Sequence, residues 1–183
     1  MSRDDMNINS GEWGSDQPAR MTSGDMSHGA YGDDSTEATR QLNSFLRGEI
    51  SAAETYRMAI DKIADSDKGS ANAGLLREIQ EEHGRAAQAL RDRIRELGGE
   101  PSDSSGAWGA WAKFTQGTAN LFGDAASLKS LKEGEEHGLK DYSEGLDDID
   151  MTSAELVQNQ LMPAQRRHIN LLDQLISAIA PTT

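Results

Sequence analysis

Four stretches of this chain carry apolar residues at alternating steps of three and four, and one acidic or histidine side chain interrupts each stretch. This spacing places residues on the buried face of an amphipathic helix. The interrupting residues are Glu49, His83, Glu135 and His168. A buried charge costs on the order of several kcal/mol unless a partner compensates it. The pattern therefore predicts four helices whose polar residues meet in one core layer, where they compensate one another or hold a metal ion.

The apolar members of the four stretches define the expected core of an all-α, antiparallel up-down-up-down four-helix bundle. They are Leu42, Leu46, Ala53, Tyr56, Ile60 and Ile63; Leu76, Ile79, Ala86, Leu90, Ile94 and Leu97; Leu131, Leu139, Tyr142, Leu146 and Ile149; and Val157, Leu161, Ala164, Leu171, Leu175 and Ile179.

The polar residues also indicate an internal duplication of a helical hairpin. A Gly-Glu pair followed by a tyrosine occurs on the first and third helices, and a Gln-x-x-His motif occurs on the second and fourth. The motifs are Glu49–Tyr56 and Glu135–Tyr142, offset by 86 positions, and Gln80–His83 and Gln165–His168, offset by 85. Two copies of a hairpin predict a bundle with pseudo-twofold symmetry.

Composition excludes several classes of function. The formal net charge is -13 and there is no basic stripe, which argues against binding to nucleic acid or to anionic membranes. With no cysteine, the chain has neither disulfides nor thiolate metal sites. It lacks an apolar run of the roughly 20 residues that span a bilayer, and its beginning does not resemble a secretory signal. We therefore expect a cytoplasmic protein.

The chain divides into two expected regions. Residues 1–35 are rich in Gly, Ser, Asp and Met, which predicts a disordered tail. This tail repeats a Gly-x-aromatic-Gly-x-Asp pattern around Trp13 and Tyr31, so it is a candidate docking segment for a protein partner. Residues 36–180 form the bundle. The aromatic segment Trp108–Phe122 predicts an additional short helix that covers one end and offers a contact for a homo-oligomer.

Capping signals give the expected helix boundaries. The first helix should run over about 36–64 and the second over about 72–97, where Gly98-Gly99 ends it. Gly123-Asp124 suggests a stop and a new start, which places the third helix at about 124–146. Thr152, with Glu155 three residues later, predicts the start of the fourth. Pro163 lies inside that helix and should bend it and release the carbonyl of Asn159.

On these residues the chain resembles the ferritin-like superfamily, and more narrowly an uncharacterised bacterial ferritin-like family known only as a domain of unknown function. The resemblance covers residues 36–178. The motifs that carry it are Arg47-Gly48-Glu49 with Tyr56, Leu97-Gly98-Gly99, the aromatic segment Trp108–Trp111, and Gly134-Glu135 with Tyr142. Ferritin-like proteins bind two metal ions through a Glu on two helices and Glu-x-x-His on the other two.

The chain departs from that pattern at Gln80 and Gln165, which occupy the places of two metal-bridging glutamates. A di-iron centre is therefore disfavoured, because an amide is a poor iron ligand. The residues instead suggest one ion, Fe(II), Zn(II) or Mn(II), bound by the four interrupting residues.

The remaining candidate residues surround this predicted site. Gln80 and Gln165 would orient the ligands through hydrogen bonds. Tyr56 and Tyr142, two turns from the glutamates, would donate hydrogen bonds to the layer or relay electrons. Glu82 and Glu136 would become ligands if the helix register were shifted by one residue.

Two functions remain open from the sequence. The resemblance implies metal handling or protection against oxidative stress, with a weak ferroxidase or peroxide-consuming reaction as the one enzyme class suggested. The alternative is a metal-free structural bundle in which the Glu/His layer only fixes helix register. In that case the tail or the Trp-rich segment would bind a partner.

Overall fold

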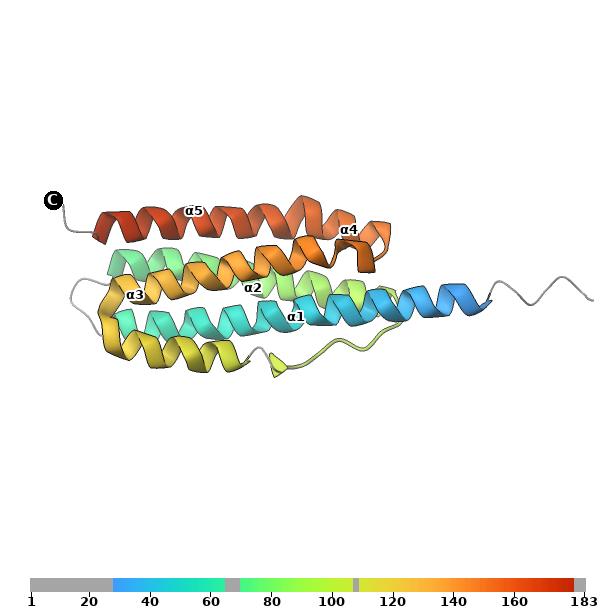
Figure 1. Cartoon of the computed structure of the whole chain (residues 1–183), viewed down its shortest axis with the longest axis horizontal. Coiled ribbons are helices and arrows are strands. Elements are labelled where there is room, and N and C mark those ends of the chain that lie inside the picture. The colour runs from blue at the N-terminus through green and yellow to red at the C-terminus, as the bar shows by residue number, and fades with distance from the viewer. Residues whose placement is uncertain (1–27, 65–69, 107–108, 180–183) are drawn as a thin grey trace, which may run out of the picture.

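Four rods of helix lie side by side and form an antiparallel bundle, in agreement with the predicted fold (Figure 1). The structure is a computed structural model that describes residues 28–64, 70–106 and 109–179. The first two rods are α1 (His28–Ala64) and α2 (Ser70–Glu96), and the third is the C-terminal part of α3 (Gly109–Glu144), whose N-terminal part runs in the opposite direction (Figure 1). A 3₁₀ turn, η2 (Leu146–Asp148), leads to the fourth rod, which consists of α4 (Met151–Leu156), the π-helical turn η3 (Val157–Leu161) and α5 (Met162–Ile179). These ranges contain no strand.

Helix α1 begins at His28, earlier than the start predicted near Thr36. The polar residues that suggested a cap there continue the helix instead, because a capping preference is worth only about 1 kcal/mol and a helix propagates readily once it has formed. Residues 1–27 lie outside the described residues, so the disordered tail and its docking role stay predictions.

Helix α2 ends at the predicted glycines. The amide of Gly99 donates to the carbonyl of Ile94 at 2.9 Å, and Gly98 has a φ of 76°, a left-handed conformation that side chains disfavour. A Cβ atom at Gly99 would lie 2.3 Å from the Thr39 side chain, so this turn also packs directly against α1.

Helix α3 has the bounds of one element, Gly109–Glu144, but it consists of two parts that run in opposite directions (Figure 1). The second part is the third rod of the bundle, and the first part is the additional short helix that the sequence predicts before it. The predicted division of this region is therefore visible in the path of the backbone. Trp108 and the side chains of residues 110–124 lie outside the described residues. The predictions that this segment covers one end of the bundle and contacts a second copy of the chain therefore stay predictions.

The fourth rod differs from the prediction at its start. Its cap is Asp150, not Thr152: the Asp150 carboxylate accepts hydrogen bonds from the amides of Thr152 and Ser153. Pro163, which lacks an amide proton, is the second residue after the π-helical turn Val157–Leu161. Beyond this turn Gln165 and Leu172 are buried where Ala164 and Leu171 were predicted.

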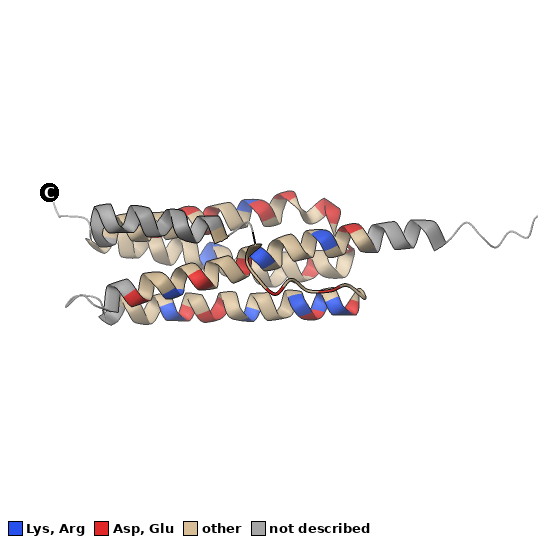
Figure 2. Ribbon diagram, turned by 90° about the horizontal axis from the view of Figure 1, so that it is seen from below, with Lys and Arg blue, Asp and Glu red and all other residues tan. Residues whose placement is uncertain are grey.

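The core consists of two apolar clusters separated by a polar layer. One cluster includes Leu46, Leu90 and Leu161, and the other includes Tyr56, Leu76 and Leu172. On every rod the interrupting polar residue lies between members of the two clusters. The bundle therefore encloses this layer between two apolar cores. Lys, Arg, Asp and Glu are interspersed along the helices (Figure 2). Within the described ranges, no helix combines the length and the hydropathy that a membrane span requires.

Candidate metal centre

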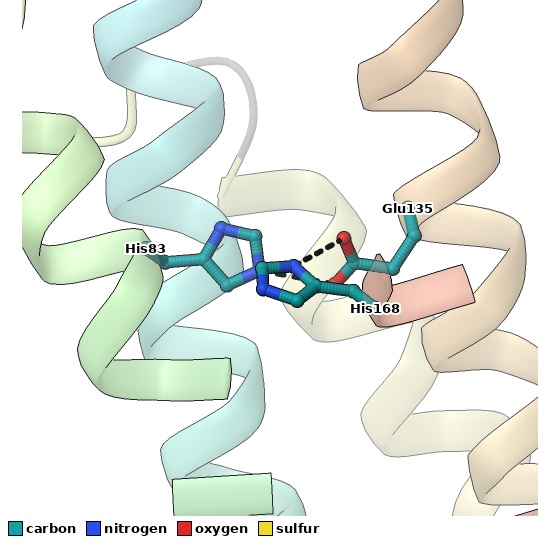
Figure 3. Close-up of side chains that lie close together, drawn as sticks. All are labelled: His83, Glu135 and His168. Atoms are coloured by element: carbon teal, nitrogen blue, oxygen red, sulfur yellow. Dashed lines mark hydrogen bonds and ion pairs between the residues drawn. The ribbon is translucent and has the colours of Figure 1, made fainter. Parts of the chain in front are cut away.

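The four interrupting residues form one hydrogen-bonded chain across the bundle. His83 lies between two carboxylates: its Nδ1 is 2.8 Å from Oε2 of Glu49, and its Nε2 is 3.0 Å from Oε1 of Glu135. The other Glu135 oxygen, Oε2, is 3.2 Å from Nδ1 of His168. Both imidazole rings thus face Glu135, and their centroids are 5.0 Å apart (Figure 3). The chain continues to Glu82, whose Oε2 is 3.1 Å from Nε2 of His168.

Almost all of this hydrogen-bonded network is buried. The exposed fractions are 1% for His83, 2% for Glu135, 4% for His168 and 5% for Glu49. Glu82 is different, because its side chain is 32% exposed and pairs with the exposed guanidinium of Arg167 at 3.0 Å. The polar layer therefore reaches the surface at Glu82, on the side of α2 and α5.

Two tyrosines cross the bundle to complete the layer. Tyr56 on α1 donates a hydrogen bond of 2.5 Å to Glu135 on α3, and Tyr142 on α3 donates to Glu49 on α1. Burial and the adjacent carboxylates raise the pKa of both phenols well above the ordinary value. Both hydroxyls therefore keep their protons and serve as donors to the carboxylates. The contacts are reciprocal, as a duplicated hairpin predicts.

The electrostatics of the layer centre on His83. Burial alone would lower the pKa of this imidazole, but the charges and hydrogen bonds of Glu135 and Glu49 outweigh it and raise that pKa to about 10. Burial would likewise raise the pKa of Glu135, but His83 and His168 hold it at about 2. In the metal-free state, a buried imidazolium thus lies between two carboxylates.

Only some of the other candidate residues contact the layer. The Gln165 amide donates to the backbone carbonyl of Glu135 at 3.0 Å, which anchors the ligand's helix rather than its carboxylate. Gln80 is half-buried and has no hydrogen bond to any described residue of the layer. Glu82 joins the layer through His168. Glu136 does not join it, because this exposed carboxylate pairs with Lys132 at 3.3 Å.

Three side chains could provide a donor set for a metal ion. One ligand atom from each of His83, Glu135 and His168 lies within 4.8 Å of the others, and all three residues are buried. Glu49 is outside this group, since it contacts the opposite ring nitrogen of His83. Two imidazoles and one carboxylate are a known ligand set for divalent metals. The cluster could hold one ion, with Glu49 fixing the ring of His83 in the way that second carboxylates orient metal-bound histidines.

The analysis of the sequence did not identify Arg167, which pairs with Glu82 beside His168. A signal was present: Arg167 lies 85 positions after Glu82, the same offset that relates the two histidines. Residues at equivalent positions of a duplicated hairpin meet near its pseudo-twofold axis, so opposite charges there are expected to pair.

The family model for a domain of unknown function, DUF2383, matches residues 37–148. This match covers more than half of the chain. The chain belongs to the DUF2383 family. A search of the curated proteins finds no match to this DUF2383 chain.

Two solved structures share the fold of the DUF2383 chain. Bacterioferritin from Rhodobacter capsulatus, with a metal-free dinuclear site and heme iron, has a TM-score of 0.64 and 23% identity over 78% of this chain and 85% of its own. A ferritin-like, diiron-carboxylate protein from Bacillus anthracis has a TM-score of 0.63 and 20% identity over 82% of this chain and 99% of its own. The bundle is therefore ferritin-like, as the sequence predicts.

Proposed function

We propose that this protein binds one divalent metal ion in the core of its bundle, through His83, Glu135 and His168. The observation that carries the proposal is the convergence of three buried ligand atoms within 4.8 Å. Glu49 acts as the carboxylate that orients His83 through Nδ1, so that Nε2 is directed to the ion. Glu82 has the same relation to His168, which offers Nδ1 to the ion and Nε2 to the carboxylate. The two proteins that share the fold also support a metal, since one is a bacterioferritin with a dinuclear site and heme iron and the other is a diiron-carboxylate protein.

Charge balance favours one ion over two. The buried part of the layer contains two carboxylates, Glu49 and Glu135, which balance a single dication. A second dication would leave two buried positive charges uncompensated, which is costly in a low-dielectric core. The glutamines that replace bridging glutamates carry no charge and do not compensate: Gln80 makes no hydrogen bond to a described residue of the layer, and Gln165 donates to a backbone carbonyl.

The ligand set suits Fe(II), Zn(II) or Mn(II). Iron would supply one-electron chemistry toward peroxide or dioxygen, and zinc would supply none. We infer a role in metal handling or in protection against oxidative stress, in the cytoplasm. The chain's own contribution is to hold the two imidazoles in fixed tautomers, to keep the tyrosine hydroxyls protonated beside the carboxylates, and to exclude water.

A metal-free structural layer is the second candidate, and one observation favours it. Every buried side-chain nitrogen and oxygen of the described residues has a hydrogen-bond partner without any ion. An imidazolium held between two carboxylates would fix the helix register by itself. This function needs no chemistry and leaves partner binding to segments outside the described residues.

Elemental analysis of protein purified without an affinity metal or a chelator separates the two candidates. We expect close to one equivalent of iron, zinc or manganese in the wild type and none in His83→Ala or His168→Ala. His137→Ala is the matched control, because this histidine lies on α3, is 49% exposed and belongs to no metal-ligand group among the described residues. Metal-free wild type that also fails to bind added Fe(II), Zn(II) or Mn(II) would leave the structural layer as the function.

Glu49 and Glu135 can be told apart by their glutamine variants. Glu135→Gln removes a ligand and should abolish binding. Glu49→Gln keeps a hydrogen-bond acceptor for His83 and should weaken the affinity by about 10- to 100-fold, the usual effect of losing an orienting carboxylate. An equal loss of metal affinity in both variants would indicate that Glu49 is itself a ligand.

A further inference from the structure

The proposed metal site is closed, so an ion needs a way to reach it. Two features connect the layer to the surface. One is Glu82, which contacts His168. The other is a cavity of about 60 Å³ between α1 and α3, whose lining includes Glu49, His83 and Glu135. The two lie on different sides of the bundle and differ in charge.

The cavity has the size of a route for ions rather than that of a binding site for an organic molecule. Its 60 Å³ holds a few water molecules, whereas pockets for drug-sized ligands measure roughly 300–1,000 Å³. Its lining includes small residues, among them Gly48 and Ala52 on α1. A Cβ atom at Gly48 would have no neighbour within 4 Å beyond its own helix backbone, which indicates free space at this wall.

Charge separates the two routes. Among the described residues, the lining of the cavity includes the carboxylates of Glu49, Glu135 and Asp141 and no lysine or arginine. The Asp141 side chain is 28% exposed and the adjacent His137 is 49% exposed, so these two lie nearest to solvent. On the other side, the guanidinium of Arg167 covers the Glu82 carboxylate. A cation is attracted by the first route, whereas the Glu82–Arg167 ion pair gives the second route no net negative charge.

We propose that divalent cations enter and leave the core layer through the cavity between α1 and α3, past Asp141 and Gly48. The proposal rests on the proposed function, because it concerns the route to that same site. Gly48 is not a proposed ligand, and a leucine there would narrow this cavity. Since the route is shared by both directions, blocking it slows binding and release equally and leaves the equilibrium affinity unchanged.

The test is stopped-flow mixing of the chelator-treated full-length protein with Co²⁺, followed by visible absorption, with release measured by mixing the loaded protein with EDTA. In Gly48→Leu, both rates should fall by about tenfold or more, which corresponds to a barrier higher by at least about 1.4 kcal/mol, while the Kd stays within about twofold of the wild type. Ala52→Leu, one turn along the same wall, should act in the same direction. Circular dichroism establishes that each variant is folded.

Gly74→Leu is the matched control. Gly74 is also a half-buried helical glycine whose Cβ would have no neighbour within 4 Å, but it does not line the cavity. Its rates should equal those of the wild type. Wild-type rates in Gly48→Leu and Ala52→Leu, together with faster binding in Arg167→Gln, would overturn the proposal and place the route at Glu82. Absence of Co²⁺ binding by the wild type at equilibrium would overturn the proposed function, and the route with it.

Discussion

Raising the pH above about 7 should destabilise the metal-free protein through one side chain, His83. Its pKa is about 10 in the folded state and 6.5 in the unfolded chain. Between these values the folded state binds one more proton than the unfolded state, so the free energy of unfolding decreases by about 1.4 kcal/mol per pH unit. The contribution of His83 is complete below pH 6.5 and is lost as the pH approaches 10. Over the whole interval the loss amounts to about 5 kcal/mol, which is comparable with the total stability of many domains.

The lowered pKa of Glu135 reports the same ion pair from its other partner, so the two contributions are not added. Glu135 governs the acid side. Its contribution is present above the unfolded pKa of 4.5 and is lost as the pH falls toward about 2. The metal-free protein should therefore be most stable between about pH 4.5 and 6.5 as far as this layer is concerned.

Urea denaturation of EDTA-treated protein at pH 6.5, 7.5 and 8.5 measures the effect. Other groups also titrate, so the informative quantity is the difference in slope between the wild type and His83→Gln. Glutamine retains a hydrogen-bond donor for the carboxylates but has no proton to lose. We expect the wild type to lose stability more steeply, by close to the full 1.4 kcal/mol per pH unit. Parallel curves for the two proteins would refute the buried imidazolium.

Two further predictions concern stability at constant pH. Tyr56→Phe and Tyr142→Phe each remove a hydrogen bond to a buried carboxylate and should lower the free energy of unfolding by about 1–3 kcal/mol in urea titrations; a value near zero would mean that water replaces the hydroxyl. Asp150→Ala removes the helix cap and its ion pair with Arg93 at 2.7 Å, and should cost about 1–2 kcal/mol. Thr152→Ala is its control and should be nearly neutral; equal losses in thermal or urea unfolding would restore Thr152 as the cap.

The buried faces of the helices were predictable because burial in a bundle is periodic along the sequence. A residue at step three or four from Leu46 or Leu90 must share its face, whatever the neighbouring helix contains. Glu49 and His83 could thus be placed in the core without any knowledge of their partners. The same reasoning located Glu135 and His168.

Helix ends were less predictable because competing signals there differ by only about 1 kcal/mol. The bounds of α3 include Gly123-Asp124, which satisfies the usual pattern for a stop and a start, and the path of this element reverses along its length (Figure 1). Thr152 satisfies the capping-box pattern, but Asp150 captures the free amides and is also held by Arg93. That ion pair joins residues 57 positions apart, and no local pattern can detect it.

The orientation of each imidazole ring could not be predicted from the sequence, because it depends on which acceptor lies opposite each nitrogen once the helices have packed. The duplication predicts a symmetric layer in which both histidines lie between Glu49 and Glu135. His83 follows this prediction, but His168 directs its second nitrogen to Glu82. The equivalent positions 82 and 167 hold residues of opposite charge, so only one of the two histidines has an additional carboxylate beside it.

This asymmetry has a functional consequence. In a symmetric layer, Glu49 and Glu135 would be equivalent, and each would have the same claim to be a ligand. With His168 tied to Glu82, both imidazoles face Glu135, which becomes the one carboxylate that two histidines share. Glu49 is left with the outer nitrogen of His83 and the hydroxyl of Tyr142. A single charged pair at the edge of the bundle, Glu82 and Arg167, therefore distinguishes three proposed ligands, His83, Glu135 and His168, from the two carboxylates that we propose orient them, and this arrangement suits one ion.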